Sequence, residues 1–399
     1  MVSKIRSLLL PSFRKLLRIL AKLLGYFGCD SKIFGPPKGY YWTLDDLIQS
    51  KVDNSEVIFK DRIASVTIGK PFNFQRLPND GERDEEIFEE CEIRLNLLEN
   101  GRFHLEPHAL LSSDDKLVFS ESCCYGMNPQ KHWIFNQLKL SRCRELYGKS
   151  FMLGGRANYW HLLSEELPSL YRLQKNGMDI NDFDYLLVHE SKYDFQKQIY
   201  DLFQIPQERF VQLKSNPHIQ SDQLLFFSPN YQPDIEALRW TRDHILTFIK
   251  KESNNEKRLF ISRQDSNSKR ILNNSKVKDL LNKYDFEIFK PENCTVIEQI
   301  RVFKNCSFVI GAHGAALANL MFCKPDTDVI EIRSKYHYGS FTAPKVYMWY
   351  KELNKLKYSF LPTNIMESKN LKGRSKMDSD FIIDIQELEA LIKLHLNQR

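Results

Sequence analysis

The sequence predicts an α/β protein built from two facing Rossmann-like domains, with a basic amphipathic helix at the N-terminus. Residues 150–213 and 258–332 both alternate short apolar strands with helical segments, the pattern of a parallel sheet covered by helices. A polar linker at 252–257 separates these two blocks. The length of 399 residues leaves room for two or three domains, and we expect a cleft between the two α/β blocks. The predicted divisions are residues 1–28, 29–232, 233–370 and 371–399.

The net charge is concentrated at the start of the chain. There are 57 Lys and Arg residues against 51 Asp and Glu residues, a formal charge of +6. Six of the basic residues and none of the acidic ones lie within residues 1–28, which leaves 51 of each sign in the rest. A nucleic-acid-binding domain carries positive charge along a groove or face of its folded body, so this distribution argues against that class.

Residues 1–28 are predicted to form a helix that lies in a membrane interface. Apolar residues recur every three or four positions from Ile5 to Phe27, and the basic side chains from Arg14 to Lys22 gather on the opposite side. Charges interrupt every apolar run, so the segment is too broken to span a bilayer, and no signal-peptide cleavage site follows it. The alternative is a helix packed on the body of the protein.

The first α/β block follows a region of predicted hairpins. Strand-like runs at 92–98, 102–105 and 116–120 are separated by Asn100-Gly101 and Asp114-Asp115, which favour turns. Further strands are expected at 56–60 and 64–68. The block itself is predicted as strand 150–153, helix 158–176, strand 185–189, helix 193–203 and strand 209–213, followed by a long helix at 233–251.

The second block shows the clearest alternation in the chain. We predict strands at 258–261, 286–289, 308–310 and 329–332, with helices at 275–283, 296–303 and 315–322 between them. Residues 305–323 have no formal charge and are long enough for a transmembrane helix, but Gly311 and Gly314 mark a turn in their middle. A buried strand, a tight turn and a buried helix explain this segment better. A last amphipathic helix is expected at 381–396.

Cysteine usage and the histidine spacing give no metal site. The eight cysteines have no regular spacing, and with no export signal we expect reduced thiols in a cytoplasmic protein. His104 and His108 have the spacing of a helical metal pair, but Pro107 breaks the helix that would align them.

The turn at residues 311–314 is the first candidate binding site. It joins a predicted strand to a helix, and ligands of open parallel sheets bind beyond the carboxyl ends of strands. Gly314 allows close approach to the backbone, the amides at Gly314 and Ala315 attract anions, and His313 stands at the lip. The spacing is neither that of a dinucleotide-binding turn nor that of an ATP phosphate loop. Tight strand–helix packing would also account for the glycines.

Two further groups lie at strand ends of the same predicted sheet. Arg263 and Arg270, in the loop at 261–274, suit a diphosphate through forked hydrogen bonds, although exposed arginines are common in polar loops. Glu331 ends the fourth strand, where it would accept hydrogen bonds from a ribose or cap a helix.

A candidate proton-transfer pair lies in the first block. Asn158, His161 and Glu165 fall on one face of the helix that follows Gly154-Gly155. A carboxylate one turn from a histidine fixes the imidazole for general-base work, while a surface ion pair is the simpler interpretation.

Taken together, these elements resemble glycosyltransferase family 61, inverting enzymes of GT-B fold. The matching segments cover about half of the chain, and they are 158–173, 262–274, Glu298-Gln299, 311–322 and 329–333. The pattern departs at Ala316 and Ala318, where the family usually has a glycine and a threonine, and at Asn274, where an acidic residue is common.

The resemblance implies sugar transfer from a nucleotide diphosphate sugar, UDP-linked by expectation, to a glycan or lipid-linked acceptor hydroxyl. Residues 29–232 become the acceptor-side domain and 233–370 the nucleotide-sugar domain, and the helix in 371–399 is expected to cross back to the first domain. His161 backed by Glu165 is the first candidate for the base, and Glu166 is the second. The implied donor ligands are Arg263, Arg270, His313, Gly314, Ala315, Asn319 and Glu331.

Further expectations follow from that assignment. Arginines and helix amides can stabilise the departing diphosphate, so we expect no metal or other cofactor. We expect a peripheral protein at the inner membrane face that acts in capsular or other surface polysaccharide synthesis and binds no nucleic acid. The alternatives are an epimerase-like GT-B enzyme that binds a UDP-sugar without transferring it, and a catalytically silent sugar- or membrane-binding module.

Overall fold

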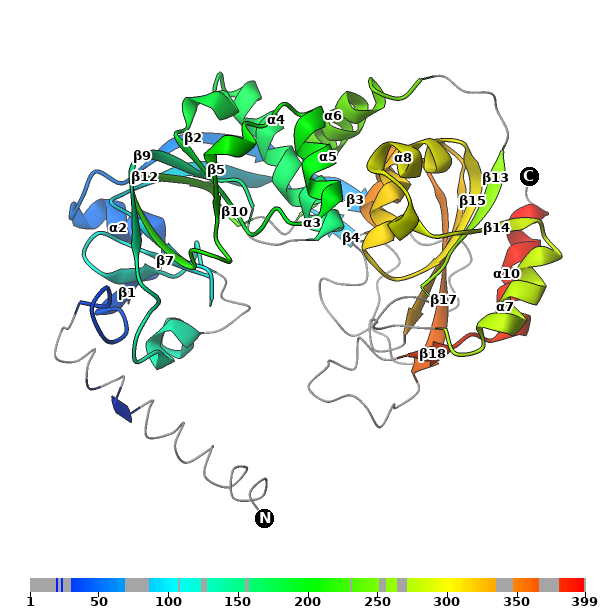
Figure 1. The fold of residues 1–399 in the computed structure, drawn as a ribbon, viewed down its shortest axis with the longest axis horizontal. Coiled ribbons are helices and arrows are strands. Elements are labelled where there is room, and N and C mark those ends of the chain that lie inside the picture. The colour runs from blue at the N-terminus through cyan, green and yellow to red at the C-terminus, as the bar shows by residue number, and fades with distance from the viewer. Residues whose placement is uncertain are drawn as a thin grey trace, which may run out of the picture.

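The protein forms two sheet-centred units that lie side by side in an arch (Figure 1), so the predicted mixed α/β class is confirmed. The first unit is built on a ten-stranded sheet and the second on a six-stranded sheet. The computed structural model describes residues 19–20, 23, 30–68, 86–106, 108–122, 128–154, 158–229, 232–250, 256–263, 271–334, 347–365 and 380–397.

The first unit joins an antiparallel half to a parallel half. Its strands are β1 (Gly39–Tyr41), β2 (Glu56–Ile63), β5 (Cys91–Glu99), β6 (Arg102–His104), β7 (Ala109–Leu111), β8 (Lys116–Val118), β9 (Arg144–Met152), β10 (Tyr185–Val188), β11 (Phe210–Gln212) and β12 (His218–Phe227). Its helices and helical turns are α2 (Leu44–Ser50), η1 (Pro129–Lys131), η2 (Trp133–Asn136), α3 (Tyr159–His161), η3 (Leu162–Glu166), α4 (Leu167–Lys175), η4 (Ile180–Asp182), α5 (Asp194–Leu202), η5 (Gln207–Arg209) and, leading to the second unit, α6 (Ile235–Leu246). A separate pair, β3 (Val66–Ile68) and β4 (Glu86–Phe88), is antiparallel.

β12, which the sequence did not reveal, organises the first sheet. It runs parallel to β9 and antiparallel to both β5 and β6. β5 and β6 pair with successive parts of β12 in the same direction, so they follow one another along a single line, and Asn100-Gly101 only interrupts them. The predicted β5–β6 hairpin is therefore wrong. The hairpin at Asp114-Asp115 is confirmed, since it joins antiparallel β7 and β8.

Two histidines face each other inside the first unit. His104 on β6 and His218 on β12 are register partners whose rings lie 5.2 Å apart, and both are buried. The Nδ1 of His218 donates to the carbonyl of Ser141 at 2.8 Å. Burial lowers the pKa of His218 to about 4 and also lowers the pKa of His104. Both rings are therefore neutral at pH 7.

These neutral histidines make the first unit sensitive to acid. Between pH 6.5 and 4 the unfolded chain binds a proton at His218 that the folded chain does not, so stability falls as the pH falls through this window. The shift corresponds to about 3 kcal/mol at pH 4. Urea unfolding should therefore show a smaller loss of stability between pH 7 and pH 4 for His218→Asn than for the unchanged protein. Equal losses would contradict a neutral His218.

The second unit is a parallel α/β sheet with one antiparallel edge strand. Its strands are β13 (Lys257–Ile261), β14 (Phe286–Phe289), β15 (Cys306–Ala312), β16 (Asp328–Ser334), β17 (Lys357–Ile365) and β18 (Phe381–Ile382). Its helices are α7 (Asn274–Asn282), η6 (Pro291–Asn293), α8 (Val296–Lys304), η7 (Ala315–Phe322), α9 (Met348–Asn354) and α10 (Ile385–Leu396). Residues 305–323 form β15 and η7, as predicted. Among the residues that the structure describes, no helix is both long and apolar enough to cross a membrane.

The strand order of the second sheet fixes where a ligand would bind. The order is β14-β13-β15-β16-β17-β18, so the chain turns from β13 to one side and returns on the other with β15. The loops at the carboxyl ends of β13 and β15 therefore lead to opposite sides of the sheet, and ligands of open α/β sheets bind at such a switch point. The first sheet repeats the arrangement, because β10 and β11 lie on one side of β9 and β12 on the other.

The C-terminal helix stays with the second unit. α10 packs against α7 and β17, and its buried His395 bonds Ser359 at 2.8 Å and Asp328 at 2.7 Å. Leu388 and Ile392 fill the outer apolar core of the second sheet. The expectation that this helix crosses back to the first domain is wrong, since its apolar face is covered by the second unit.

The two units share one apolar core. The cluster runs from Phe151 and Leu167 in the first unit to Ile300 and Tyr350 in the second. α6 lies between them and packs against α4 on one side and against α9 and η7 on the other (Figure 1). Hydrogen bonds cross the same boundary, for example from the Val296 amide to Gln198 Oε1 at 2.8 Å.

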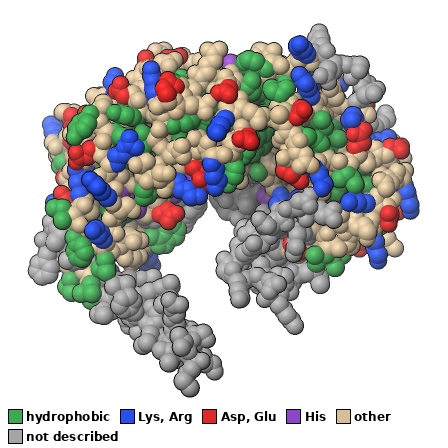
Figure 2. Space-filling model, viewed as in Figure 1, with side chains coloured by type: hydrophobic (Ala, Val, Ile, Leu, Met, Phe, Trp, Pro, Cys, Tyr) green, Lys and Arg blue, Asp and Glu red, His purple; other side chains and the backbone are tan. Residues whose placement is uncertain are grey.

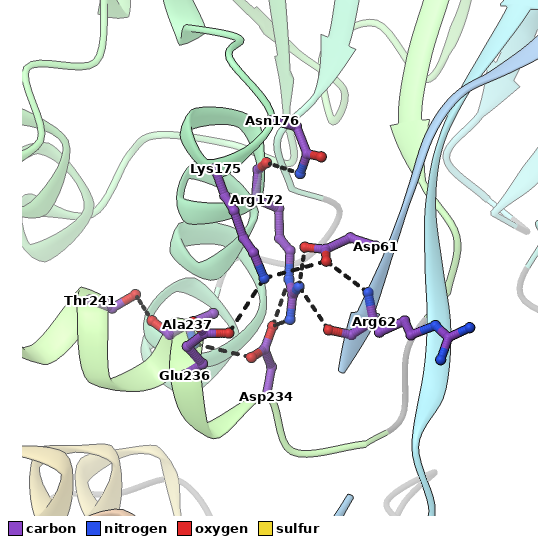
Figure 3. A network of polar contacts seen from close by, with 9 residues as sticks. All are labelled: Asp61, Arg62, Arg172, Lys175, Asn176, Asp234, Glu236, Ala237 and Thr241. Atoms are coloured by element: carbon purple, nitrogen blue, oxygen red, sulfur yellow. Dashed lines mark hydrogen bonds and ion pairs between the residues drawn. The ribbon is translucent and has the colours of Figure 1, made fainter. Parts of the chain in front are cut away.

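A buried arginine ties the start of α6 to the first unit (Figure 3). Arg172 on α4 forms ion pairs with Asp61 on β2 and with Asp234, the N-cap of α6. Only 2% of the Arg172 side chain is exposed. Lys175, one turn on, adds contacts to Asp61 at 3.3 Å and to Glu236 at 3.5 Å. Arg172 thus fixes the helix through which the two units meet.

Most of the predicted N-terminal helix lies outside the described residues. Ile19, Leu20 and Leu23 are helical and are 50%, 42% and 48% exposed.

Candidate functional site

The switch point of the second sheet brings together Arg263 and Gly314. Arg263 follows β13 and Gly314 follows β15, the two strands that diverge there. A Cβ atom built on Gly314 would lie 1.9 Å from an Arg263 guanidinium nitrogen. The backbone of Gly314 is extended, so its conformation does not demand glycine. A side chain at this position would displace the Arg263 guanidinium, which occupies that space.

The helix after Gly314 presents its first amides at this point. η7 is a 3-10 helix rather than the α-helix that the pattern predicts, and no side chain caps its start. Its first hydrogen bond runs from the Leu317 amide to the Gly314 carbonyl at 2.9 Å. The amides of Ala315 and Ala316 precede that bond, and both residues are partly exposed. A guanidinium and helix-start amides together form an anion-binding arrangement.

His313 is held by a buried carboxylate. Its Nδ1 lies 2.6 Å from Glu331 Oε1, and Tyr358 donates to the other oxygen at 2.6 Å. The Arg333 guanidinium is 2.8 Å from Glu331. Burial alone would raise the pKa of Glu331, but the Arg333 charge and the His313 hydrogen bond outweigh it and lower that pKa to about 2. The Glu331 carboxylate, charged at pH 7, therefore favours the His313 tautomer that carries its proton on Nδ1.

The structure corrects two of the predicted donor ligands. Glu331 is fully buried and its oxygens are taken by His313, Tyr358 and Arg333, so it positions His313 rather than binding a ribose.

Asn319 is also fully buried, which separates it from any ligand. Its Oδ1 accepts from Tyr159 at 2.8 Å and its Nδ2 donates to Gln299 at 2.9 Å. Asn319 thus joins the two units.

The helix that carries His161 contains a π turn. It was predicted as one helix over 158–176, but η3 has a π-helical bond from the Leu167 amide to the Leu162 carbonyl. Pro168 explains this turn, because a proline lacks the amide that would bond Ser164 and its ring clashes with that carbonyl. Such turns often occur at functional sites.

The structure separates the two candidate carboxylates. Glu165 Oε2 lies 2.7 Å from His161 Nδ1, and these side chains are 44% and 18% exposed. Glu166 is buried against Gly154, where an added Cβ would lie 2.0 Å from its carboxyl carbon, and it accepts from Tyr200 at 3.5 Å. Glu165 is therefore the partner of His161. The hypothesis that Glu166 serves as a base is not supported, because its carboxylate is turned into the body.

α9 connects the two histidine sites. At its start the Tyr347 ring lies 5.1 Å from the His313 ring, and the Trp349 ring lies 5.7 Å from Trp160, the neighbour of His161. Tyr350 bonds Ser164 in the π turn. α9 was not predicted from the sequence, although the aromatic residues at 347–350 could have indicated it.

Arg270 lies outside the described residues, so its place in the site stays a prediction. Among the residues that the structure describes, no group of three or more His, Cys, Asp or Glu side chains is arranged to hold a metal ion.

A comparison with known protein families matches the part of the chain that carries this site. Residues 159–330 match the family model for glycosyltransferase 61. No curated protein matches the chain. Two solved structures share a slight likeness. The dodecameric iron-containing heptosyltransferase TibC in complex with ADP-D-beta-D-heptose is 14% identical with a TM-score of 0.31, and covers 76% of this chain and 93% of its own. The dodecameric iron-containing glycosyltransferase TibC from enterotoxigenic E. coli H10407 is 11% identical with a TM-score of 0.30 and has the same coverage. A likeness at this level carries no argument.

The family match spans the helix of His161 at one end and β16 at the other, and it includes the β13–β15 switch point. This match identifies residues 159–330 as a region similar to the glycosyltransferase 61 family, and it supports a glycosyltransferase.

Proposed function

We propose that the protein is an inverting glycosyltransferase of GT-B architecture that moves a sugar from a nucleotide diphosphate sugar, UDP-linked, to an acceptor hydroxyl. The observation that carries this proposal is the Arg263 guanidinium lying against Gly314 at the β13–β15 switch point, beside His313. A diphosphate placed there meets the Arg263 guanidinium and the first amides of η7.

In this proposal the second unit binds the donor. Arg263 and the amides at Gly314 and Ala315 hold the diphosphate and stabilise the charge that develops on it when the sugar leaves. His313 contacts the phosphate or the sugar through Nε2, since its Nδ1 is engaged by Glu331. Arg270 joins the donor loop. Charge stabilisation by these groups makes a metal ion unnecessary for the transfer.

The first unit supplies the base. His161 Nε2 takes the proton of the acceptor hydroxyl as that oxygen attacks the anomeric carbon from the side opposite the diphosphate. Glu165 accepts from Nδ1 at 2.7 Å, which fixes the ring and stabilises the imidazolium that forms. Residues 1–28, with six basic and no acidic side chains, place the enzyme on an anionic inner membrane face, where a lipid-linked acceptor for surface polysaccharide is available.

A panel of UDP-sugars tests this function. Slow release of UDP without an added acceptor, in buffer containing EDTA, is the expected result. Interconversion of sugar isomers would point instead to an epimerase-like enzyme, and UDP binding without any turnover would point to a silent module. Activity that EDTA abolishes would overturn the metal-independent mechanism.

Arg263→Ala should weaken UDP binding by about 1–3 kcal/mol, the range for a lost charge-assisted hydrogen bond. Calorimetric titration with UDP measures this directly. Arg258→Ala is the matched control, because Arg258 lies near the amino end of the same strand and bonds the Tyr284 carbonyl at 2.7 Å. Equal UDP affinities for the two variants would remove Arg263 from the donor site.

A further inference from the structure

The end of the first unit that is remote from the second carries exposed aromatic and aliphatic side chains. Ile33 is 76% exposed, Phe34 44%, Trp42 54% and Trp133 46%. We call these four residues the tryptophan patch. Figure 2 shows hydrophobic side chains gathered at the lower left, at the end of the molecule where β1 lies in Figure 1. A cluster of large exposed apolar side chains is typical of a surface that contacts a membrane or another protein.

The patch rests on a small core of its own. Ala109, Leu111, Leu117, Phe119, Ile134 and Leu140 form this core, with Tyr40 and Phe135 packed on it. The two tryptophans are joined through rings: Trp42 to Phe119 at 5.8 Å, Phe119 to His132 at 6.5 Å, and His132 to Trp133 at 6.3 Å. The two indole rings are thus connected by ring contacts to a packed apolar core.

The segment that carries Ile33 and Phe34 is fastened to the same base. The Gly35 amide bonds the Leu138 carbonyl at 2.8 Å, just beyond η2. The Ser31 amide bonds Asp115 at 2.9 Å. The chain then continues into β1, the edge strand that pairs with β8. All four side chains of the patch therefore belong to one end of the sheet.

The two chain segments that carry the patch are rich in basic residues. The two surface stretches that bear it, residues 30–42 and 128–145, contain six Lys and Arg residues against two acidic ones, although the chain outside residues 1–28 is neutral overall. Lys38 and Lys131, close in sequence to Trp42 and Trp133, are exposed. Asp45, near Trp42 on α2, is already paired with Arg94 at 2.9 Å. Amphipathic indole rings with neighbouring cations match the interface of an anionic bilayer.

The position of the tryptophan patch in the chain also favours contact with an anionic bilayer. The patch begins at residue 33, five residues after the basic segment 1–28, and Ile19, Leu20 and Leu23 in that segment are also exposed. A membrane-bound helix in residues 1–28 would by itself leave the orientation of the folded body open, whereas a second contact on that body would define it. We propose that the tryptophan patch is a second membrane-docking surface on the folded body, which inserts Trp42 and Trp133 into the interface of an anionic bilayer. It deepens the membrane placement proposed above.

Quenching by brominated lipid tests the insertion in the full-length protein. Vesicles of phosphatidylglycerol and phosphatidylcholine with brominated acyl chains should quench part of the tryptophan emission. A Trp42→Phe/Trp133→Phe variant keeps apolar side chains at both positions, so it should still bind vesicles and yet lose most of that quenching. Of the three tryptophans that remain, Trp160 and Trp349 are only 8% exposed, and Trp240 lies on α6 against the rings of Phe203 and His244, away from the patch. Quenching that is the same in the variant would overturn the proposal.

Removal of the apolar groups gives a second measurement. Trp42→Ser/Trp133→Ser should lower the affinity for anionic vesicles by about tenfold or more in co-sedimentation, with residues 1–28 present in every variant. Phe248→Ser is the matched control, since Phe248 is 44% exposed beyond the end of α6, and it should bind like the unchanged protein. Unchanged binding of the serine variant would overturn the proposal.

Two other results would also decide the question. A dimer that the serine variant converts to a monomer, with vesicle binding unchanged, would assign the patch to a second copy of the chain and overturn the proposal. The vesicle readout does not depend on sugar transfer, so an inactive protein with quenched tryptophans would refute the proposed function alone. An active one without quenching would refute the patch alone.

Discussion

His161→Ala should lower turnover by about 10²–10⁴-fold and leave the affinity for UDP within twofold, because positioned general bases contribute about that much to rate. The His161 ring belongs to the first unit and the anion site belongs to the second, so loss of the ring leaves Arg263 and Gly314 in place. Initial rates of UDP release with acceptor, together with calorimetric titration of UDP, measure the two quantities separately.

Two controls show whether the loss reflects proton transfer. His161→Gln retains a hydrogen-bonding group for Glu165 but cannot take up a proton, so it should lose as much activity as His161→Ala. Added imidazole should restore part of the activity to His161→Ala, an effect that a structural role for the ring would not produce. Full activity in His161→Ala would exclude it as the base.

Arg172→Met should destabilise the protein by about 3–5 kcal/mol, the range for removing one partner of a buried ion pair. The substitution leaves Asp61 and Asp234 with side chains only 14% and 11% exposed and without their main cation. Burial raises the pKa of Asp61, but its bonds to the Arg62 amide and to Arg172 outweigh burial and lower that pKa in the intact protein. Urea unfolding at pH 7 measures the loss.

Arg62, an exposed arginine on β2, provides the matched control. The Arg62 side chain is 77% exposed and pairs with Glu90 at 2.7 Å, so Arg62→Met should change stability by less than about 1 kcal/mol. Adding Asp61→Asn and Asp234→Asn to Arg172→Met should recover part of the lost stability, because the uncompensated charges are removed while Asn still caps α6. Equal losses of stability for Arg172→Met and Arg62→Met would contradict the prediction, because they would show that solvent screens the ion pairs of Arg172 with Asp61 and Asp234.

Elements with a strong local pattern were predictable from the sequence. The strand at 286–289 was placed at its observed limits, and β13, α8 and β16 were placed within a few residues of theirs. Each is an apolar run of the right period with turn residues at its ends. The pairing of His161 with Glu165 was also predictable, because positions i and i+4 face each other on any helix.

Elements defined by distant partners were not predictable in this way. β12 has polar residues at its start and is held by three strands from other parts of the chain, so nothing local identified it. α9 is short and was missed, although its aromatic side chains connect His313 with the helix of His161. The turn-like Asn100-Gly101 was misassigned because the choice between a hairpin and a kink depends on β12.

The roles of Glu331 and Asn319 show the same limit at the site itself. Glu331 was expected to bind the donor because of its place at the end of a predicted strand, and Asn319 because of the family resemblance. Burial decides otherwise: the Glu331 carboxylate is surrounded by His313, Arg333 and Tyr358, and the Asn319 amide by Tyr159 and Gln299. A polar group fully bonded inside the protein has no capacity left for a ligand.

The sequence by itself determined the α/β class, the glycosyltransferase segment and the neutral charge of the body, because periodicity, motif order and charge are properties of the chain alone. Only the tertiary structure decided that Arg263 fills the space above Gly314, that Glu165 and not Glu166 bonds His161, and that α10 remains with the second unit. Each of these depends on which surfaces far apart in the sequence exclude water from one another, and that is settled only when the sheets and helices pack.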